Sequence, residues 1–320
     1  MARKSSLKRK VGIVLMQNKL EGIIVALSTP ITEKESLDKQ ALEKLISHVL
    51  AGGVNGVFIM SGTGEFGHML DSVWEESIEF AVDKVQKRVP VLAGVSDMGT
   101  ERVKERVRRA QQYEIDGVVV TSSYFYGLSD PKSIMMHFTE IADFSKVPVV
   151  MYEHPGITGL SMGLTEILEL QRHPNIVGIK DSSGDFARFH QLLMEKDPNF
   201  KVFQGSDALV GVSALCGGDG AIVGLANIMP RLLCDIYLAG KTGDLTVYKK
   251  HQKRLLKLIE LVVRDGTITE QSYNAGIKAA LKALGIGNGL LTKPFLTPSN
   301  EEIKAAGKIL RELGLSVVED

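Results

Sequence analysis

The amino-acid sequence predicts a TIM barrel, which is a closed ring of eight parallel β-strands surrounded by helices, followed by a helical appendage. Short runs of apolar, often β-branched residues recur at intervals of about thirty residues, as expected for buried strands. Helical patterns lie between these runs, and the runs stop after Pro230. Near-continuous apolar runs are typical of parallel strands buried on both faces, and strands that alternate with helices indicate βαβ units.

Eight apolar runs are predicted to be the strands of the barrel. They cover residues 23–27, 56–60, 89–95, 117–120, 147–151, 176–179, 201–203 and 220–223. An open, doubly wound sheet is the alternative arrangement. The glycine pattern G-x-G-x-x-G, which would favour that alternative, does not follow the first run.

Helices are predicted between the strands and after the last one. Those between strands cover 36–50, 72–87, 100–113, 130–145, 164–172, 186–195 and 207–216, and those after Pro230 cover 231–239, 245–264, 271–284 and 300–313. Ser72 with Glu75 fits a capping box, and Asp130 precedes a proline at a first helical position. One late helix is expected to close the barrel, and the others to form the appendage.

The composition is that of a globular protein without a strong charge preference. Of 320 residues, 44% are hydrophobic and 24% charged, and 38 basic side chains balance 38 acidic ones. This balance gives no indication of binding to nucleic acid or to an anionic membrane. Cys216 and Cys234 lack metal-ligand spacing, which indicates a reduced, cytoplasmic compartment and no metal site.

Three segments are predicted along the chain. Residues 1–18 form a basic, flexible extension, whose apolar run at 11–16 is too short for a signal-peptide core or a membrane span. Residues 19–240 form the barrel. Residues 241–320 form a helical domain that packs on the barrel, because no low-complexity linker separates the two.

The chemistry is expected at Lys180, which ends the sixth strand before a polar turn, in the segment I-V-G-I-K-D-S-S-G-D. Burial disfavours the ammonium form of a lysine, and the neutral amine is able to attack a carbonyl. The alternative is a lysine with its ammonium in water or paired with Asp181. Tyr152 ends the neighbouring fifth strand and is placed to shuttle protons for such a lysine, or else is a rim aromatic that meets only water.

The loop after the second strand reads Ser61-Gly62-Thr63-Gly64-Glu65. Backbone N–H groups at two glycines and the Thr63 hydroxyl form a nest able to hold a carboxylate. A tight βα turn that needs glycines would give the same pattern.

These motifs together resemble the dihydrodipicolinate synthase / N-acetylneuraminate lyase superfamily of Schiff-base lyases, over residues 22–314. The resemblance rests on the S-G-T-G-E loop, on Tyr152 lying 28 residues before Lys180, on the I-V-G-I-K-D segment and on G-L-A-N-I-M-P at 224–230. It implies that Lys180 forms the Schiff base, that Tyr152 is the catalytic tyrosine, and that no separate cofactor is used. It further implies roles for four other positions: Thr63 with the backbone of Gly62 and Gly64 holds the pyruvate carboxylate, and the Ile222 carbonyl faces the lysine nitrogen.

Three departures from the synthases bear on the substrate. Gly62 replaces a second hydroxy residue, Phe125 falls where a relay tyrosine from a neighbouring subunit is expected, and Ile157 falls where an arginine grips the carboxylate of aspartate semialdehyde. These departures weaken the assignment to lysine biosynthesis. The G-T-G-E-F loop and the K-D-S-S-G-D turn are more similar to members that act on 2-keto-3-deoxy sugar acids or related hydroxy-keto acids. Candidate contacts to the rest of the substrate are Tyr126, Asp207, Ser206, Glu153 and His154, although His154 equally fits a turn before Pro155 and Asp207 a helix cap.

The leading functional prediction is an aldolase-type lyase that breaks or forms a C–C bond through a lysine-bound enamine of pyruvate. The alternatives are a dihydrodipicolinate synthase, a Schiff-base dehydratase of a deoxy-keto sugar acid, a sugar-phosphate isomerase and a non-catalytic barrel that binds a keto acid. The expected partners are small keto acids and aldehydes, with neither nucleic acid nor membrane. The resemblance also implies a homo-oligomer, a tetramer built as a dimer of dimers, in which the aromatic cluster at 124–126 reaches across an interface.

Overall fold

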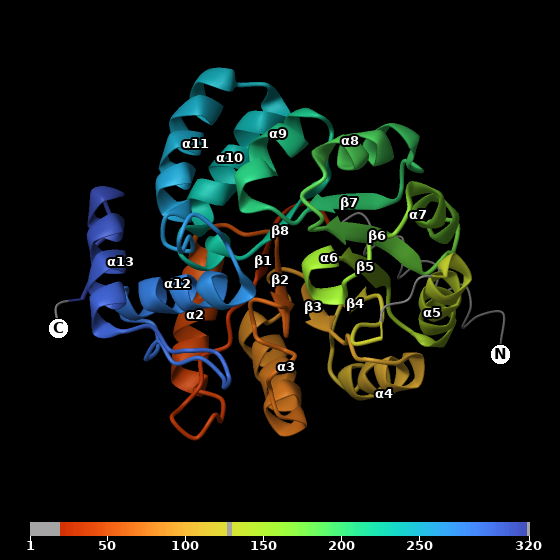
Figure 1. Cartoon of the computed structure of the whole chain (residues 1–320), viewed down its shortest axis with the longest axis horizontal. Coiled ribbons are helices and arrows are strands. Elements are labelled where there is room, and N and C mark those ends of the chain that lie inside the picture. The colour runs from red at the N-terminus through yellow and green to blue at the C-terminus, as the bar shows by residue number, and fades with distance from the viewer. Residues whose placement is uncertain (1–19, 127–129, 319–320) are drawn as a thin grey trace.

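The computed structural model describes residues 20–126 and 130–318, and its centre is a closed barrel of eight parallel strands (Figure 1). The strands are β1 (Gly22–Ala26), β2 (Gly56–Ile59), β3 (Val91–Gly94), β4 (Gly117–Thr121), β5 (Val149–Glu153), β6 (Ile176–Asp181), β7 (Lys201–Gln204) and β8 (Gly220–Val223). Each strand pairs with the next in sequence, and β1 pairs with β8 to close the ring. The predicted fold class is therefore confirmed.

The strand sequences are apolar on both faces because both faces are buried. Alternate residues, such as Ile24, Phe58, Val150 and Phe203, fill the inside of the barrel as one cluster. The intervening residues pack outward against the helices in the main core. The filled interior leaves room for chemistry only at the ends of the strands.

Helices follow the strands around the outside of the barrel. They are α2 (Lys39–Ala51), α3 (Asp71–Val85), α4 (Thr100–Ala110), α5 (Pro131–Phe144), α7 (Leu164–Leu170), α8 (Phe186–Glu195), α9 (Val210–Leu215) and α10 (Pro230–Thr242). Three short elements were not expected as such: the helix α6 (Pro155–Thr158), and the 3-10 turns η1 (Asp207–Leu209) and η2 (Leu225–Asn227). The predicted helix over 207–216 is thus divided into η1 and α9.

The capping box predicted at the start of α3 is wrong. The start signal predicted for α5, an aspartate followed by a proline at the first helical position, is confirmed. The N-cap of α3 is Leu70, which has no side-chain oxygen, and Glu75 is used elsewhere. The Asp130 side chain accepts a hydrogen bond from the Lys132 backbone, with Pro131 in the first turn. Local sequence alone does not reveal whether a glutamate turns back to its own helix or towards the next one.

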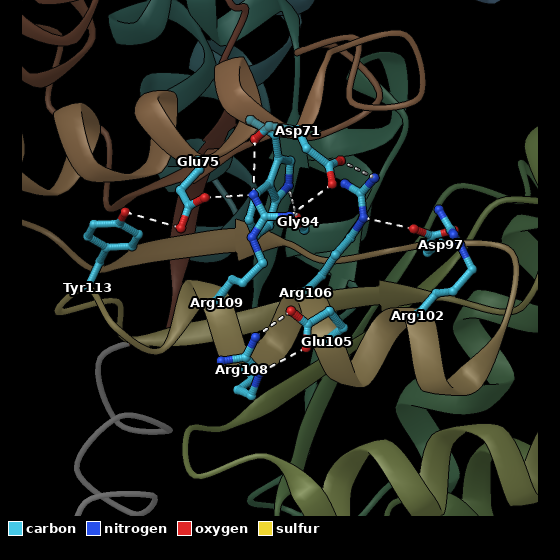
Figure 2. A network of polar contacts seen from close by, with 11 residues as sticks. Asp71, Glu75, Gly94, Asp97, Arg102, Glu105, Arg106, Arg108, Arg109 and Tyr113 are labelled. Carbon is cyan, nitrogen blue, oxygen red and sulfur yellow. Dashed lines mark hydrogen bonds and ion pairs between the residues drawn. The ribbon is translucent and has the colours of Figure 1, made fainter.

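Glu75 belongs to a polar network that joins α3 to α4 (Figure 2). It accepts a hydrogen bond from Arg109 at 2.6 Å, while Arg106 binds Asp97, which follows β3, at 2.9 Å. Both guanidinium groups lie 5.3 Å from the ring of the fully buried Trp74, whose indole N–H donates to the Gly94 carbonyl. The network therefore fixes two neighbouring βα units against each other at the end of β3.

The C-terminal helices lie together beside β8, β1 and α2 (Figure 1). α10 packs on α9 and closes the barrel, and α11 (Leu245–Ile259), α12 (Glu270–Ala283) and α13 (Asn300–Glu312) follow it. No strand occurs after β8 in the described residues, as predicted. The division proposed between residues 240 and 241 falls inside α10 and stays a prediction.

The predicted flexible extension, residues 1–18, lies outside the described residues. Within the residues that the structure describes, no helix combines the length and the apolar character needed to cross a membrane.

Candidate active site

A cavity of about 480 Å³ opens at the C-terminal ends of the strands. Its walls come from the barrel and from the C-terminal helices. The barrel supplies Gly62, Thr63, Tyr152, His154, Lys180, Ser182, Ser183, Ser206, Asp207 and Ile222, and the C-terminal segment supplies Ile259, Val262, Ile268, Thr269, Glu270 and Tyr273. Of the eleven residues predicted to form the site or to contact the substrate, eight line this cavity.

Lys180 lies at the floor of the cavity and is almost completely buried, with 4% of its surface exposed. Its amine lies 4.0 Å from the centre of the Tyr152 ring and 5.5 Å from that of Phe58. Burial lowers the pKa of Lys180 to about 7, although the charges of Glu270 and Asp207 act in the opposite direction. A substantial fraction of the side chain is therefore the nucleophilic free amine at neutral pH.

Asp181 does not pair with Lys180, because consecutive residues of a strand point to opposite faces. Its carboxylate accepts hydrogen bonds from Arg188, at 2.9 Å, and from the Ser183 backbone. The sequence left open whether Asp181 neutralises the lysine. The alternation of the strand removes that pairing and leaves the amine facing the cavity.

Tyr152 lies directly opposite Lys180 in the ladder between β5 and β6. It is 4% exposed, and its ring forms part of the barrel interior against Phe58. Burial and the charge of Glu270 raise the pKa of Tyr152 far above its usual value, although a hydrogen bond with Ser182 acts to lower it. The phenol is therefore protonated at rest and suited to donate a proton to a leaving hydroxyl.

The loop at 61–65 has one amide fewer for a ligand than expected. The Gly64 N–H donates to the carbonyl and the hydroxyl of Ser61, so this amide is used within the turn. Gly62 and Thr63 line the cavity, whereas Gly64 does not. Of the residues in the predicted carboxylate nest, only Gly62 and Thr63 line the cavity, and the Gly64 amide closes the turn.

Gly64 has a steric reason for being glycine. A Cβ at this position would come within 3.0 Å of the Leu27 carbonyl and of the Thr29 hydroxyl. Glu65, which follows it, binds the backbone and hydroxyl of Thr292 and pairs with the buried Lys278 at 2.5 Å. The loop is thereby anchored to the C-terminal segment.

Asp207 enters the cavity from η1 and is not a helix cap. One carboxylate oxygen accepts from the Leu225 backbone at 3.0 Å, and the other accepts from the Tyr273 hydroxyl at 2.5 Å. The same hydroxyl accepts a hydrogen bond from the Gly224 N–H. Burial raises the pKa of Asp207 to about 6, although these hydrogen bonds and Lys180 oppose the effect.

Glu270 is a second carboxylate at the cavity, placed at the first position of α12. Its carboxylate oxygen Oε1 lies 3.2 Å from Nε2 of the His154 imidazole. Burial alone would raise the pKa of Glu270, but the hydrogen bond and charge of His154 and the charge of Lys180 outweigh burial and lower it. The N-terminus of a helix also stabilises a negative charge, so Glu270 is an anion at neutral pH.

Several sequence-predicted residues lie elsewhere. Tyr126 does not line the cavity of its own chain, since its side chain is 75% exposed and contacts Phe125 edge to face. Glu153 faces away from the cavity, where it accepts from Ser161 and Met162, because Tyr152 takes the inward position. Ile222 packs in the barrel interior and also lines the main cavity, whereas Ile157 lines a smaller neighbouring cavity of about 190 Å³. That the Ile222 carbonyl faces the lysine nitrogen stays a prediction.

Sequence reasoning did not identify Glu270, Tyr273 and Asn274 as site residues. All three lie on the first turns of α12, and Asn274 donates to the Gly62 carbonyl across 212 residues of sequence. No spacing rule connects segments so far apart. The only local signal in the sequence is Lys278, which is a lysine in an otherwise apolar stretch. In the structure Lys278 is buried and pairs with Glu65, so the helix lies beside the loop at 61–65.

The sequence profile described as the Dihydrodipicolinate synthetase family matches residues 19–313. The chain belongs to this family. Curated members include the 4-hydroxy-tetrahydrodipicolinate synthase of Methanospirillum hungatei, 32% identical over 293 residues, which are 91% of this chain and 98% of that one. An uncharacterized DapA-like lyase of Thermofilum pendens is 32% identical over 307 residues, covering 94% of this chain and 100% of the relative.

The same fold is found in solved structures of the family. YagE of E. coli K12, in complex with pyruvate, superposes with a TM-score of 0.86 at 27% identity, covering 92% of this chain and 99% of that chain. As a member of the dihydrodipicolinate synthetase family, the protein is a pyruvate-dependent lyase. Members of this family hold their substrate as a Schiff base on a lysine and do not require a separate cofactor.

Proposed function

We propose that Lys180 is the lysine that carries the substrate, and that the enzyme joins or separates pyruvate and a neutral, hydroxylated aldehyde. The observation that carries the proposal is the buried Lys180 amine, with a pKa lowered to about 7, directly beside Tyr152. Such an amine attacks the C2 carbonyl of pyruvate. Tyr152 then protonates the leaving hydroxyl, so water departs and an imine forms.

The next step forms the nucleophile that attacks the aldehyde. Removal of a proton from C3 of the imine gives an enamine, and the enamine carbon adds to the aldehyde carbonyl. Hydrolysis of the product imine releases the 2-keto acid and regenerates Lys180. The reverse sequence cleaves a 2-keto-3-deoxy acid, and both directions use the same residues.

The side chains around the cavity support a hydroxylated acceptor without a carboxylate. Hydroxyl groups of Ser182, Ser183 and Ser206 line the walls. Asp207 and Glu270 add negative charge, and no arginine lines the cavity among the described residues. If the aldehyde carried a carboxylate of its own, that group would lie near the two anions Asp207 and Glu270. It would have no arginine to bind both of its oxygens, which is unfavourable for binding.

The alternative is 4-hydroxy-tetrahydrodipicolinate synthesis from pyruvate and aspartate semialdehyde. The names of the curated relatives favour this alternative over the sugar-acid assignment. The residues at the cavity favour the neutral acceptor, because Ile157 and Glu270 are poor partners for the semialdehyde carboxylate. A dehydratase that uses the same imine is compatible with the same residues.

Trapping with borohydride tests the proposed chemistry, and an acceptor panel tests the substrate. Pyruvate with borohydride should add one reduced adduct to the wild type and none to Lys180→Ala. With neutral hydroxyaldehydes, pyruvate should be consumed faster than with aspartate semialdehyde. Failure of the wild type to form the adduct overturns the function, and efficient turnover of the semialdehyde overturns the choice of acceptor.

A further inference from the structure

Solvent hydrogen reaches C3 of the bound pyruvate only if the Tyr152 hydroxyl exchanges its proton with solvent. In the proposed reaction it gives its proton to the departing hydroxyl, and the resulting phenolate removes a proton from C3 of the imine. The net result is one water released, a C=N bond formed and then an enamine, with the tyrosine protonated again. Because Tyr152 is almost completely buried, bulk water does not reach it freely.

The missing side chain of Gly62 leaves a small space beside Tyr152. A Cβ built at Gly62 would lie 3.9 Å from the Tyr152 hydroxyl oxygen, 3.8 Å from a Glu270 carboxylate oxygen and 3.6 Å from the Ile157 side chain. The space in front of Gly62 is thus bounded by a phenol, a carboxylate and an apolar wall. A water in this space that lies closer to the two oxygens than the Cβ position does would have both as hydrogen-bond partners.

Glu270 connects this space to solvent. Its side chain is 43% exposed and lines both the main cavity and the smaller one beside it. His154 holds the carboxylate by a hydrogen bond from Nε2, while its buried Nδ1 has no partner among the described residues. The imidazole therefore contacts the Glu270 carboxylate through Nε2.

We propose that Glu270, oriented by His154, relays protons between solvent and the Tyr152 hydroxyl through one water in the space that Gly62 leaves open. Glu270 takes a proton from solvent and passes it to the water, as the water gives one of its own protons to the Tyr152 phenolate; this direction is favoured because the pKa of Tyr152 is raised and that of Glu270 is lowered. The return path runs in the opposite direction. Glu270 acts through Tyr152 and not on the substrate, so it is a positioning and relay group.

Other charged groups near Glu270 do not provide this route. Lys180 is the nucleophile and is consumed in the imine. Asp207 accepts hydrogen bonds from the Tyr273 hydroxyl and the Leu225 backbone, which occupy both of its carboxylate oxygens. Asn274, on the same helix, contributes an amide that binds the Gly62 carbonyl and does not titrate. Glu270 is therefore the carboxylate placed between Tyr152 and solvent.

Exchange of the pyruvate methyl protons in D₂O, followed by ¹H NMR, tests this relay, which rests on the proposed function. Exchange requires Tyr152 to release hydrogen to solvent and return deuterium, whereas the endpoint of borohydride trapping does not. Glu270→Gln should form the trapped adduct yet exchange the methyl protons about 10²-fold more slowly. Glu301→Gln, which removes a first-turn carboxylate from α13, should exchange at the wild-type rate.

Two further measurements separate a relay from a structural role. Formate should restore part of the exchange rate in Glu270→Ala, and Glu270→Asp should retain more of it than Glu270→Gln. Wild-type exchange in Glu270→Gln, or no rescue by formate, overturns the relay. Loss of the trapped adduct in Glu270→Gln also overturns it, since Glu270 would then be needed for the imine itself. Loss of the adduct in the wild type refutes the proposed function instead.

Discussion

At the scale of single residues, the environment of Lys180 decides its chemistry. A lysine at a strand end is ordinarily a charged surface group. Here the barrel interior below it and the Tyr152 ring beside it remove water from the amine, and burial outweighs two nearby carboxylates. The residue type permits imine formation, and the burial makes the free amine available at neutral pH.

The lowered pKa of Lys180 gives a defined pH dependence. The protonated amine is not nucleophilic, so imine formation should slow about tenfold for each pH unit below about 7 and level off above it. The measurement is the initial rate of adduct formation with pyruvate and cyanoborohydride across this range. An inflection near the pKa of an exposed lysine would contradict the burial of the amine.

Replacing Tyr152 should separate imine formation from turnover. Tyr152→Phe keeps the ring that covers Lys180 but removes the proton donor. We expect slow formation of the trapped adduct and a loss of about 10²–10⁴ in turnover. Steady-state rates with the best acceptor aldehyde, compared with intact-mass trapping, give both quantities. Turnover within a few-fold of the wild type would exclude Tyr152 as the proton shuttle.

At the scale of elements, α12 connects the C-terminal helices to the catalytic loops. Glu270, Tyr273, Asn274 and Lys278 lie on one face of this helix, at spacings of three, four and eight residues. They contact His154, Asp207, the Gly62 carbonyl and Glu65 respectively. One helix therefore positions loops that follow several different strands.

The buried pair of Lys278 and Glu65 should be costly to break from one side. Lys278→Met leaves the Glu65 carboxylate buried without its cation, and we expect a loss of about 3–5 kcal/mol in the free energy of unfolding. The double variant with Glu65→Gln should recover part of that loss. Urea denaturation of the single and double variants measures both. Equal stability of Lys278→Met and the wild type would show that the pair is not buried in solution.

At the scale of the whole molecule, the barrel and the C-terminal helices build one site. The Ile259, Val262 and Tyr273 side chains complete the cavity, and Lys278 lies within the core. We therefore expect a single cooperative thermal transition that includes both parts. A scan in which residues beyond α10 melt separately, at a lower temperature than the barrel, would contradict this expectation.

The association of the chain with further copies is also a property of the whole molecule. The predicted tetramer rests on the family resemblance and on the aromatic cluster at 124–126, where Phe125 is 77% and Tyr126 75% exposed. Burial of these rings in an interface would remove a large apolar surface from water. Light scattering should give a mass several times 34.9 kDa at micromolar concentration. A mass of one chain would refute the prediction.

Much of the barrel follows from periodicity in the sequence. The eight strands begin and end within two residues of the predicted runs. The agreement has a physical reason, since parallel strands buried on both faces require apolar residues at nearly every position. Capping and helix ends agreed less well. The box predicted at Ser72 is absent, and capping boxes instead start α12 at Thr269 and α13 at Ser299.

The sequence by itself determined the fold class and the pairing of Lys180 with Tyr152, because strand order places the ends of β5 and β6 side by side. Only the tertiary structure decided which other side chains face that pair. It brought Glu270 and Tyr273 into the cavity, turned Glu153 and Tyr126 away from it, and used the Gly64 amide within its own turn. These choices depend on packing between segments far apart in the chain, which no local pattern encodes.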